Sequence, residues 1–149
     1  MKRLWLIVTL LCLLAFPVSA FAAPSDNAKA FASEETVATQ WIDTMLTKDQ
    51  PEKALTLMSK DAQSNVKPAQ MKEIRDRMAK ELGALKTTRF ISWTRFDQAD
   101  QFIYLMGFDK APTVRCELLF RKDGSLENFN LTPSSDAQQK TDAKASDKK

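Results

Sequence analysis

The spacing of apolar residues changes once along this chain, and that change limits the fold more than any other feature. Between residues 34 and 83, apolar side chains recur every three or four positions, which is the period of an amphipathic helix. From residue 86 to 131 they recur at every second position, which is the period of a β-strand. Helices followed by strands predict an α+β domain, with N-terminal helices packed on one curved antiparallel sheet.

The first helix is expected over residues 34–48, where Trp41 belongs to an apolar stripe of helical period. A second, short helix is expected to begin at Pro51, because proline is favoured in the first turn of a helix. Asp49 is expected to cap this second helix. The helix should end near Ser59.

Residues 61–67 are polar, and we expect them to form a loop. A third helix is expected to begin at Pro68 and to place Met71 and Met78 on its apolar stripe. Gly83 should end this helix, because glycine readily adopts the backbone conformation that follows a helix.

The second half of the chain predicts a four-stranded meander. The strand-like runs are residues 88–96, 102–108, 113–122 and 125–131. Asp123 and Gly124 separate the last two runs and form a strong hairpin signal. The connections are too short for crossover helices, so neighbouring strands should run antiparallel.

Residues 1–22 have the three parts of a secretory signal peptide. A basic start at Lys2 and Arg3 precedes an apolar run and a small-residue site that ends at Ala22. We expect cleavage before Ala23, with a cut after Ala20 and an uncleaved anchor as the alternatives. The apolar run is shorter than the roughly 20 residues of a membrane span, so no stable membrane insertion is expected after cleavage. The expected location is periplasmic or secreted.

The mature chain is expected to contain one domain. Residues 23–33 are interpreted as a polar lead-in, with a backward extension of the first helix through Phe31 as the alternative, and residues 34–132 as a single α+β domain. Residues 133–149 lack large apolar side chains and are expected to form a disordered tail, because they cannot bury enough surface to offset the entropy of ordering.

Composition excludes several classes of function. The 22 Lys and Arg residues exceed the 19 Asp and Glu residues by only three, so the basic surface that nucleic acid requires is not expected. The chain contains no histidine, which excludes Ser-His-Asp and Cys-His catalytic sites and the common zinc sites. With only 3 glycines there is no phosphate-binding loop, and residues 123–128 lack the acidic spacing of a calcium loop. We expect no metal and no cofactor.

Removal of Cys12 with the signal peptide would leave Cys116 as the only thiol. No intramolecular disulfide could then form. Cys116 alternates with Val114 and Leu118, which favours a buried strand residue. An intermolecular disulfide or a redox thiol is the alternative.

The order of elements and the junction sequence Leu82-Gly83-Ala84-Leu85-Lys86 resemble a small bacterial relative of nuclear transport factor 2, in particular the domain-of-unknown-function family 3887. The resemblance covers residues 33–132. It implies a curved sheet that wraps around helices to form a cone. Members of that superfamily serve as ligand-binding pockets, dimerisation modules or, less often, isomerases and dehydratases. The resemblance supplies no catalytic motif, and a histidine-dependent dehydratase site is impossible here.

The two faces of the predicted sheet differ from the usual pattern. Even-numbered positions form an apolar face that should seat the helices. Odd-numbered positions form a second face with an apolar centre flanked by arginines, at Arg89, Arg95, Arg115 and Arg121. Such a surface indicates a protein interface, either of a homodimer or with an envelope partner. The interface candidates are Ile91, Trp93, Arg95, Ile103, Leu105 and Leu119, with Trp93 and Arg95 as anchors. Coverage of this face by the chain itself is the alternative.

A second hypothesis is a small apolar ligand bound in the cone between helices and sheet. The pocket candidates are Trp41, Met45, Met78, Phe90, Phe102, Tyr104 and Phe108. The same side chains could simply fill the core. An isomerase-like enzyme would have to use carboxylates, Tyr104 or Cys116, but the aspartates near the strands fall at expected strand ends or turns. We therefore expect no catalytic residue and a non-catalytic module.

Overall fold

The computed structural model describes residues 23–134. The predicted signal peptide lies outside the described residues, as does nearly all of the predicted tail. The helical elements are α2 (Asp26–Ile42), the π-helical η1 (Asp43–Thr47), α3 (Pro51–Thr56), α4 (Lys60–Asn65) and α5 (Pro68–Leu82). The strands are β1 (Leu85–Arg95), β2 (Ala99–Phe108), β3 (Val114–Arg121) and β4 (Leu126–Pro133). Among residues 23–134, no helix has both the length and the apolar character to span a membrane.

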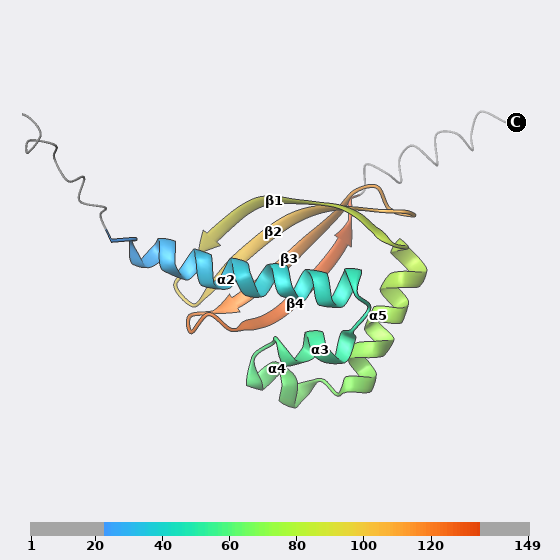
Figure 1. Ribbon diagram of the computed structural model, residues 1–149, viewed down its shortest axis with the longest axis horizontal. Helices are drawn as coiled ribbons and strands as arrows, with labels where there is room; N and C mark the ends of the chain where they lie inside the picture. Colours follow the sequence, from blue (N-terminus) through green and yellow to red (C-terminus); the bar gives the residue numbers. More distant parts are fainter. Residues whose placement is uncertain (1–22, 135–149) are drawn as a thin grey trace, which may run out of the picture.

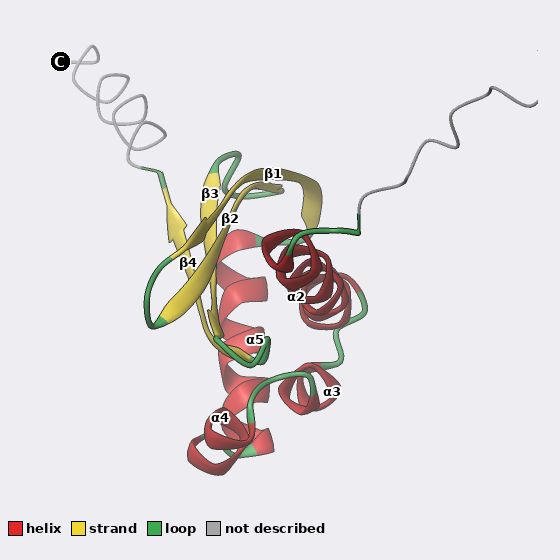
Figure 2. Ribbon diagram, turned by 90° about the vertical axis from the view of Figure 1, so that its left-hand side faces the viewer, coloured by secondary structure: helices red, strands yellow, loops and turns green. Residues whose placement is uncertain are grey.

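The strands form one sheet in the order β1-β2-β3-β4, with every neighbouring pair antiparallel. The predicted α+β class with a four-stranded meander is thereby confirmed. Figure 2 shows that the helices lie on one side of the curved sheet, which we call the inner face. The core between helices and inner face contains Trp41 and Met45 from the helices and Phe102 and Phe120 from the sheet, all fully buried.

Helix α2 begins at Asp26, eight residues before the predicted start at residue 34 (Figure 1). The predicted polar lead-in over residues 23–33 is therefore mostly helical. Ser25 caps the helix, because its hydroxyl accepts a 3.2 Å hydrogen bond from the amide of Ala28. Phe31, which indicated the alternative of a longer first helix, is the one residue of 26–33 that packs against the core. The alternative was thus the correct one, but a single apolar residue was too weak a signal to place the start of the helix.

Helix α3 begins at Pro51 as predicted, but Asp49 does not cap it. Gln50 occupies the capping position and its side chain makes no capping hydrogen bond. Asp49 instead has a positive φ of 55° and pairs with Arg75, with 3.1 Å between Oδ1 and Nε. This ion pair thus connects the segment before α3 to α5.

Helix α4 forms where a loop was predicted. Ser59 caps it by accepting a 3.0 Å hydrogen bond from the amide of Ala62. Ala62 is the only buried residue of this helix, so no apolar stripe announces it in the sequence. Just before this cap, Met58 forms a parallel bridge with Leu126 of β4, which attaches the start of α4 to the sheet.

Helix α5 runs between the predicted limits, from Pro68 to Leu82, and Gly83 follows with a φ of 82°. A Cβ at Gly83 would lie 2.9 Å from the Cβ of Asp109, so both backbone conformation and space favour glycine there. This turn delivers the chain directly into β1.

A register shift in β1 changes which face its side chains occupy. Phe90 lies opposite Tyr104, whereas the next paired residue, Ser92, lies opposite Ile103. Ile91 is the extra residue of this β-bulge, and the alternation reverses after it. Trp93 consequently lies opposite Phe102 on the inner face. The prediction that Trp93 and Arg95 share the odd-numbered face was wrong for this reason.

Strand β2 begins at Ala99, three residues before its predicted start, and this brings Asp100 into the strand. Asp100 points to the inner face with Phe102 and Tyr104, and it is fully buried. Asp100 thus lies at a strand end, as one of the two expected settings for these aspartates, but its carboxyl group is buried and not at the surface. The predicted hairpin at Asp123 and Gly124 does form between β3 and β4, with Gly124 at a φ of 82°.

Candidate functional site

The outer face of the sheet carries no helix within the part of the chain that the structure describes (Figure 2). Its apolar centre consists of Ile103 and Leu105 on β2 and Leu119 on β3. Leu119 lies opposite Gln101, so it is a diagonal neighbour of Ile103. Ile103 and Leu105 are half-buried, and 36% of Leu119 is exposed. Three of the predicted interface candidates thus form one patch.

The rim of this patch has little net charge. Arg115 pairs with Glu117 on the same strand, with 2.7 Å between Nη2 and Oε1. Arg89 lies opposite Leu105 and makes no ion pair within residues 23–134. The other rim positions in register are uncharged, at Thr87, Ser92, Thr94, Gln101, Asn128, Asn130 and Thr132. An apolar centre with a largely uncharged polar rim has the anatomy of a protein interface.

The remaining interface candidates are placed elsewhere. Ile91 is the bulged residue of β1 and is 46% exposed. Trp93 is half-buried on the inner face, and Arg95 donates a 2.8 Å hydrogen bond to Asn27 of α2. The guanidinium of Arg121 turns toward Asp61 of α4. Trp93 and Arg95 therefore lie outside the outer patch.

The predicted ligand-pocket residues are brought together on the inner face, where they pack on one another. Trp41, Met45 and Phe102 have no exposed surface, and Tyr104 stacks on Phe102 with 6.2 Å between ring centroids. Phe108 is buried, whereas 42% of Phe90 is exposed at the sheet edge. Met78 is partly buried against the same core, and it also lines a surface cavity of about 270 Å³ between α5 and β4.

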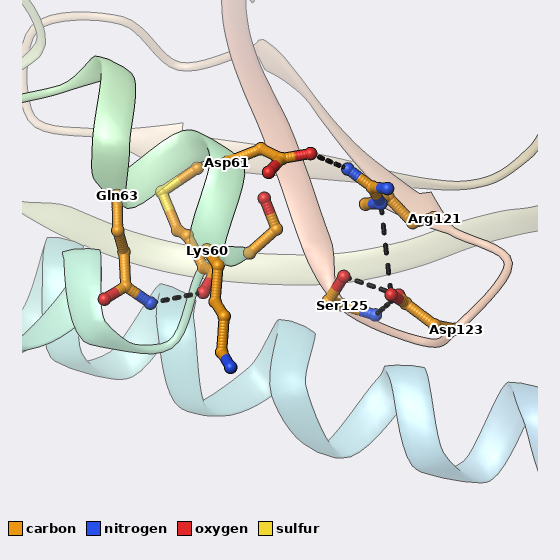
Figure 3. A pocket seen from close by; sticks show the side chains of 8 residues that line it. Lys60, Asp61, Gln63, Arg121, Asp123 and Ser125 are labelled. Carbon is orange, nitrogen blue, oxygen red and sulfur yellow. Dashed lines mark hydrogen bonds and ion pairs between the residues drawn. The ribbon is translucent and has the colours of Figure 1, made fainter.

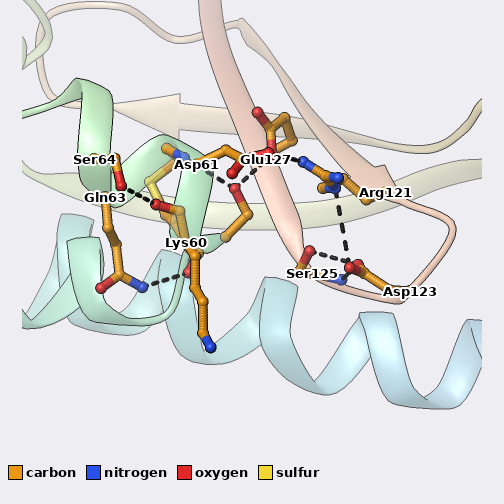
Figure 4. Close-up of polar contacts among 11 residues, drawn as sticks. Lys60, Asp61, Gln63, Ser64, Arg121, Asp123, Ser125 and Glu127 are labelled. Atoms are coloured by element: carbon orange, nitrogen blue, oxygen red, sulfur yellow. Dashed lines mark hydrogen bonds and ion pairs between the residues drawn. The ribbon is translucent and has the colours of Figure 1, made fainter.

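A larger polar groove of about 630 Å³ lies between α4 and the β3–β4 hairpin (Figure 3). Its lining residues are Met58, Ser59, Lys60, Asp61, Gln63, Arg121, Asp123 and Ser125. The guanidinium of Arg121 pairs with Asp61 and lies 3.9 Å from Oδ2 of Asp123. Glu127 also contacts it, with 3.7 Å between Oε2 and Nη1 (Figure 4).

The contacts in this groove join secondary-structure elements. Ser59 donates a 2.5 Å hydrogen bond to Glu127, and its own amide donates to the carbonyl of Leu126. Gln63 donates to the carbonyl of Met58. Within the described residues, no group of three or more acidic or cysteine side chains could hold a metal ion. The hydrogen bonds and ion pairs of the groove thus hold α4 against the sheet.

No family model matches this chain, and neither a curated protein nor a solved structure is significantly similar to it.

Sequence reasoning missed a pair of buried carboxyl groups, Glu34 on α2 and Asp100 on β2. Their exposed fractions are 1% and zero. Burial raises the pKa of Glu34 to about 7, a hydrogen bond from Trp93 opposes this rise, and the nearby Asp100 adds to it. Two signals could have revealed the pair. Asp100 keeps the alternation of Phe102, and Glu34 precedes Ala38 on the buried stripe of α2 by four positions.

Cys116 and Tyr104, the other two side chains considered for catalysis, are buried. Burial raises the pKa of the Cys116 thiol to about 12, and it likewise raises the pKa of Tyr104 to about 12. Cys116 has no exposed surface. Its thiolate is therefore scarce at neutral pH, which disfavours a redox or nucleophilic role.

Proposed function

We propose that this protein is a non-catalytic association module that forms a homodimer through the outer face of its sheet. The observation that carries the proposal is the patch of Ile103, Leu105 and Leu119, which no helix of residues 23–134 covers. Antiparallel sheets that face water usually alternate apolar and polar residues, so apolar side chains on the solvent side suggest a surface that becomes buried.

The rim favours a second copy of the chain as the occupant. Two identical surfaces that meet about a two-fold axis bring like charges together, so a strongly charged rim would oppose a homodimer. Here Arg115 is neutralised by Glu117, and Arg89 is the remaining charge near the apolar centre. The uncharged rim side chains can form hydrogen bonds across the interface.

The size of the face is compatible with a dimer of moderate stability. Strands β3 and β4 are each eight residues long. Four such strands, about 4.8 Å apart with about 3.3 Å per residue, present a flat area of roughly 500 Å². Two stacked faces would remove roughly 1,000 Å² from water, which is near the lower limit for a specific interface.

This proposal includes two expectations from the sequence. One is export to the periplasm or outside the cell through residues 1–22. The other is the resemblance to the nuclear transport factor 2-like superfamily, whose members include dimerisation modules. Helices packed on one face of a curved four-stranded meander support this resemblance at the level of architecture.

The experiment is sedimentation equilibrium of the mature protein and of the variant Leu119→Asp. Leu119 is partly exposed already, so the variant should fold, and a carboxylate in the apolar centre should prevent two faces from meeting. We expect a dimer for the unmodified protein and a monomer for Leu119→Asp, with the same circular dichroism spectrum.

Phe96→Asp is the matched control, because Phe96 is also an exposed apolar side chain but lies in the turn after β1. This variant should remain a dimer. The homodimer proposal is wrong if the unmodified protein is a monomer at all concentrations, including the case in which it binds only a different envelope protein. It is equally wrong if Leu119→Asp retains the dimer mass.

A further inference from the structure

We propose that Glu34 and Asp100 form a proton-operated latch for the first part of α2. In the latched state the pair shares one proton and holds residues 26–33 against the sheet. When both carboxyl groups are ionised, these residues separate from the sheet. The latch is independent of the outer-face dimer, because both carboxyl groups lie on the inner side.

The hydrogen bonds of the pair are complete only when one carboxyl is protonated. Trp93 Nε1 donates a 2.9 Å bond to Oε2 of Glu34, and Lys122 Nζ donates a 2.6 Å bond to Oδ1 of Asp100. Oδ2 of Asp100 is buried without a hydrogen-bond partner. The Asp100 carboxyl is close enough to Glu34 to raise its pKa, both by hydrogen bonding to the protonated form and by its negative charge. A protonated Glu34 therefore supplies the donor that Oδ2 lacks.

The charges around the pair compensate one carboxylate but leave the second without a close cation. Lys122, from the hairpin after β3, and Arg95 of β1 both lie near Oδ1 of Asp100, at 2.6 and 3.7 Å. Glu34 has the neutral indole of Trp93 as its direct partner, and Arg95 acts on it more weakly. From α2, the side chain that enters this cluster is the neutral Asn27, bound to Arg95. A second buried negative charge is therefore costly.

Few contacts hold the first turns of α2 beyond this cluster. Phe31 stacks on Phe102 with 5.5 Å between centroids and packs edge-on against Trp93 at 5.6 Å. Asn27 provides the bond to Arg95. Most other residues of this stretch are exposed, whereas the later turns bury Ala38 and Trp41. Segments with few buried contacts open at lower free energy than the core, so this part of α2 can separate on its own.

Opening would uncover an aromatic surface. Phe31 also packs edge-on against Phe90, whose side chain is 42% exposed even in the closed state. Separation of residues 26–33 would expose Phe31 together with the rings of Trp93 and Phe102 beneath it. The latch thus links proton concentration to the exposure of apolar surface at the β1 edge.

The test is hydrogen exchange with mass spectrometry at about pH 5.5 and about pH 8.5, after correction for the intrinsic pH dependence of exchange. The pKa of Glu34 is about 7 in the closed state against 4.5 for a solvated glutamate. The opening equilibrium of residues 26–34 should then increase by about 30-fold between these conditions. Residues 35–47 should show no comparable change.

Glu34→Gln is the principal variant, because its amide can donate to Asp100 at any pH and accept from Trp93. Residues 26–34 of this variant should stay protected in both conditions. Glu35→Gln is the matched control, since Glu35 is exposed and adjacent, and it should behave like the unmodified protein. An NMR titration of the unmodified protein should give a midpoint near 7 for Glu34. The latch is refuted if that midpoint lies near 4.5, if exchange of residues 26–34 is independent of pH, or if Glu34→Gln retains the increase.

Discussion

Trp93 Nε1 donates a 2.9 Å hydrogen bond to Oε2 of Glu34 and so connects β1 to α2 across 59 positions of sequence. The indole is half-buried and the carboxyl group is almost fully buried. Neutral carboxyl groups are much easier to bury than ionised ones, so the burial of Glu34 makes the stability of the fold sensitive to pH, and the bond from Trp93 reduces this sensitivity.

The free energy of unfolding should decrease as pH rises from about 4.5 to about 7. The pKa of Glu34 is raised to about 7 in the folded protein, so the folded state retains a proton that the unfolded state loses in this range. The decrease should be at most about 3 kcal/mol. Urea denaturation at a series of pH values would measure it. Because other groups also titrate, the informative quantity is the difference from Glu34→Gln, and a difference independent of pH would contradict the prediction.

Asp100→Asn should lower the midpoint of the Glu34 titration, because the variant removes the neighbouring carboxyl that raises the pKa. The midpoint should stay above 4.5, since burial is the largest cause of the rise and is unchanged. Carbon-detected NMR titration of the Glu34 carboxyl would show this. A midpoint that stays at 7 in the variant would mean that Asp100 does not act on Glu34.

Gly107→Ala should destabilise the protein by about 1–3 kcal/mol, because the added methyl group overfills its site. A Cβ at Gly107 would lie 2.6 Å from Oγ1 of Thr87, its partner on β1, and 3.3 Å from the carbonyl oxygen of Pro112. Thr87→Ala removes the closer atom and should recover most of the loss in the double variant. A thermodynamic cycle of the two single variants and the double variant would measure this coupling, and strict additivity would argue against it.

Ser59→Ala should reduce stability by about 2 kcal/mol, because the residue has two roles. Its hydroxyl accepts from the amide of Ala62 at the start of α4 and donates to Glu127 of β4. Ser64→Ala is a suitable control, since the Ser64 hydroxyl is exposed and bonds only to the carbonyl of Lys60 within its own helix. Chemical denaturation should give a clearly lower free energy of unfolding for Ser59→Ala than for Ser64→Ala. Equal losses of stability would show that the contacts of Ser59 with α4 and β4 contribute little.

Cys116 should resist alkylation in the folded protein. The thiol has no exposed surface, and burial raises its pKa to about 12, so both access and thiolate content are low. Iodoacetamide labelling followed by peptide mapping should show modification in concentrated urea but little in native buffer. Rapid native labelling of the Cys116 peptide would instead restore the hypothesis of a reactive thiol.

Much of the architecture could be predicted because periodicity reports burial. The third helix and the hairpin at Asp123 and Gly124 form where their patterns indicate. Helix α4 escaped prediction, and the early turns of α2 were indicated by Phe31 alone. Ser59 and Ser25 initiate these segments by capping, and each segment adds only one side chain to the described core. Periodicity is uninformative about a helix that buries so little.

The candidate surfaces were harder to predict, because strict alternation assumes a strand without bulges. Leu105 and Leu119 lie on β2 and β3, which pair without a register shift, and alternation placed them correctly on the outer face. Trp93 and Arg95 follow the bulge at Ile91 and were assigned to the wrong face. The carboxyl pair was missed because Asp100 and Glu34 lie 66 positions apart and meet only when α2 crosses the sheet.

The extra residue at Ile91 makes the side chains before it and after it alternate in opposite phase. Before Ile91, the side chain of Arg89 lies on the outer face of the sheet. After it, the side chain of Trp93 lies on the inner face. Without this residue, strict alternation would put Arg89 and Trp93 on the same face of the sheet, so one of the two side chains would change face. A homologue that lacked the insertion would therefore keep one of the two arrangements and lose the other.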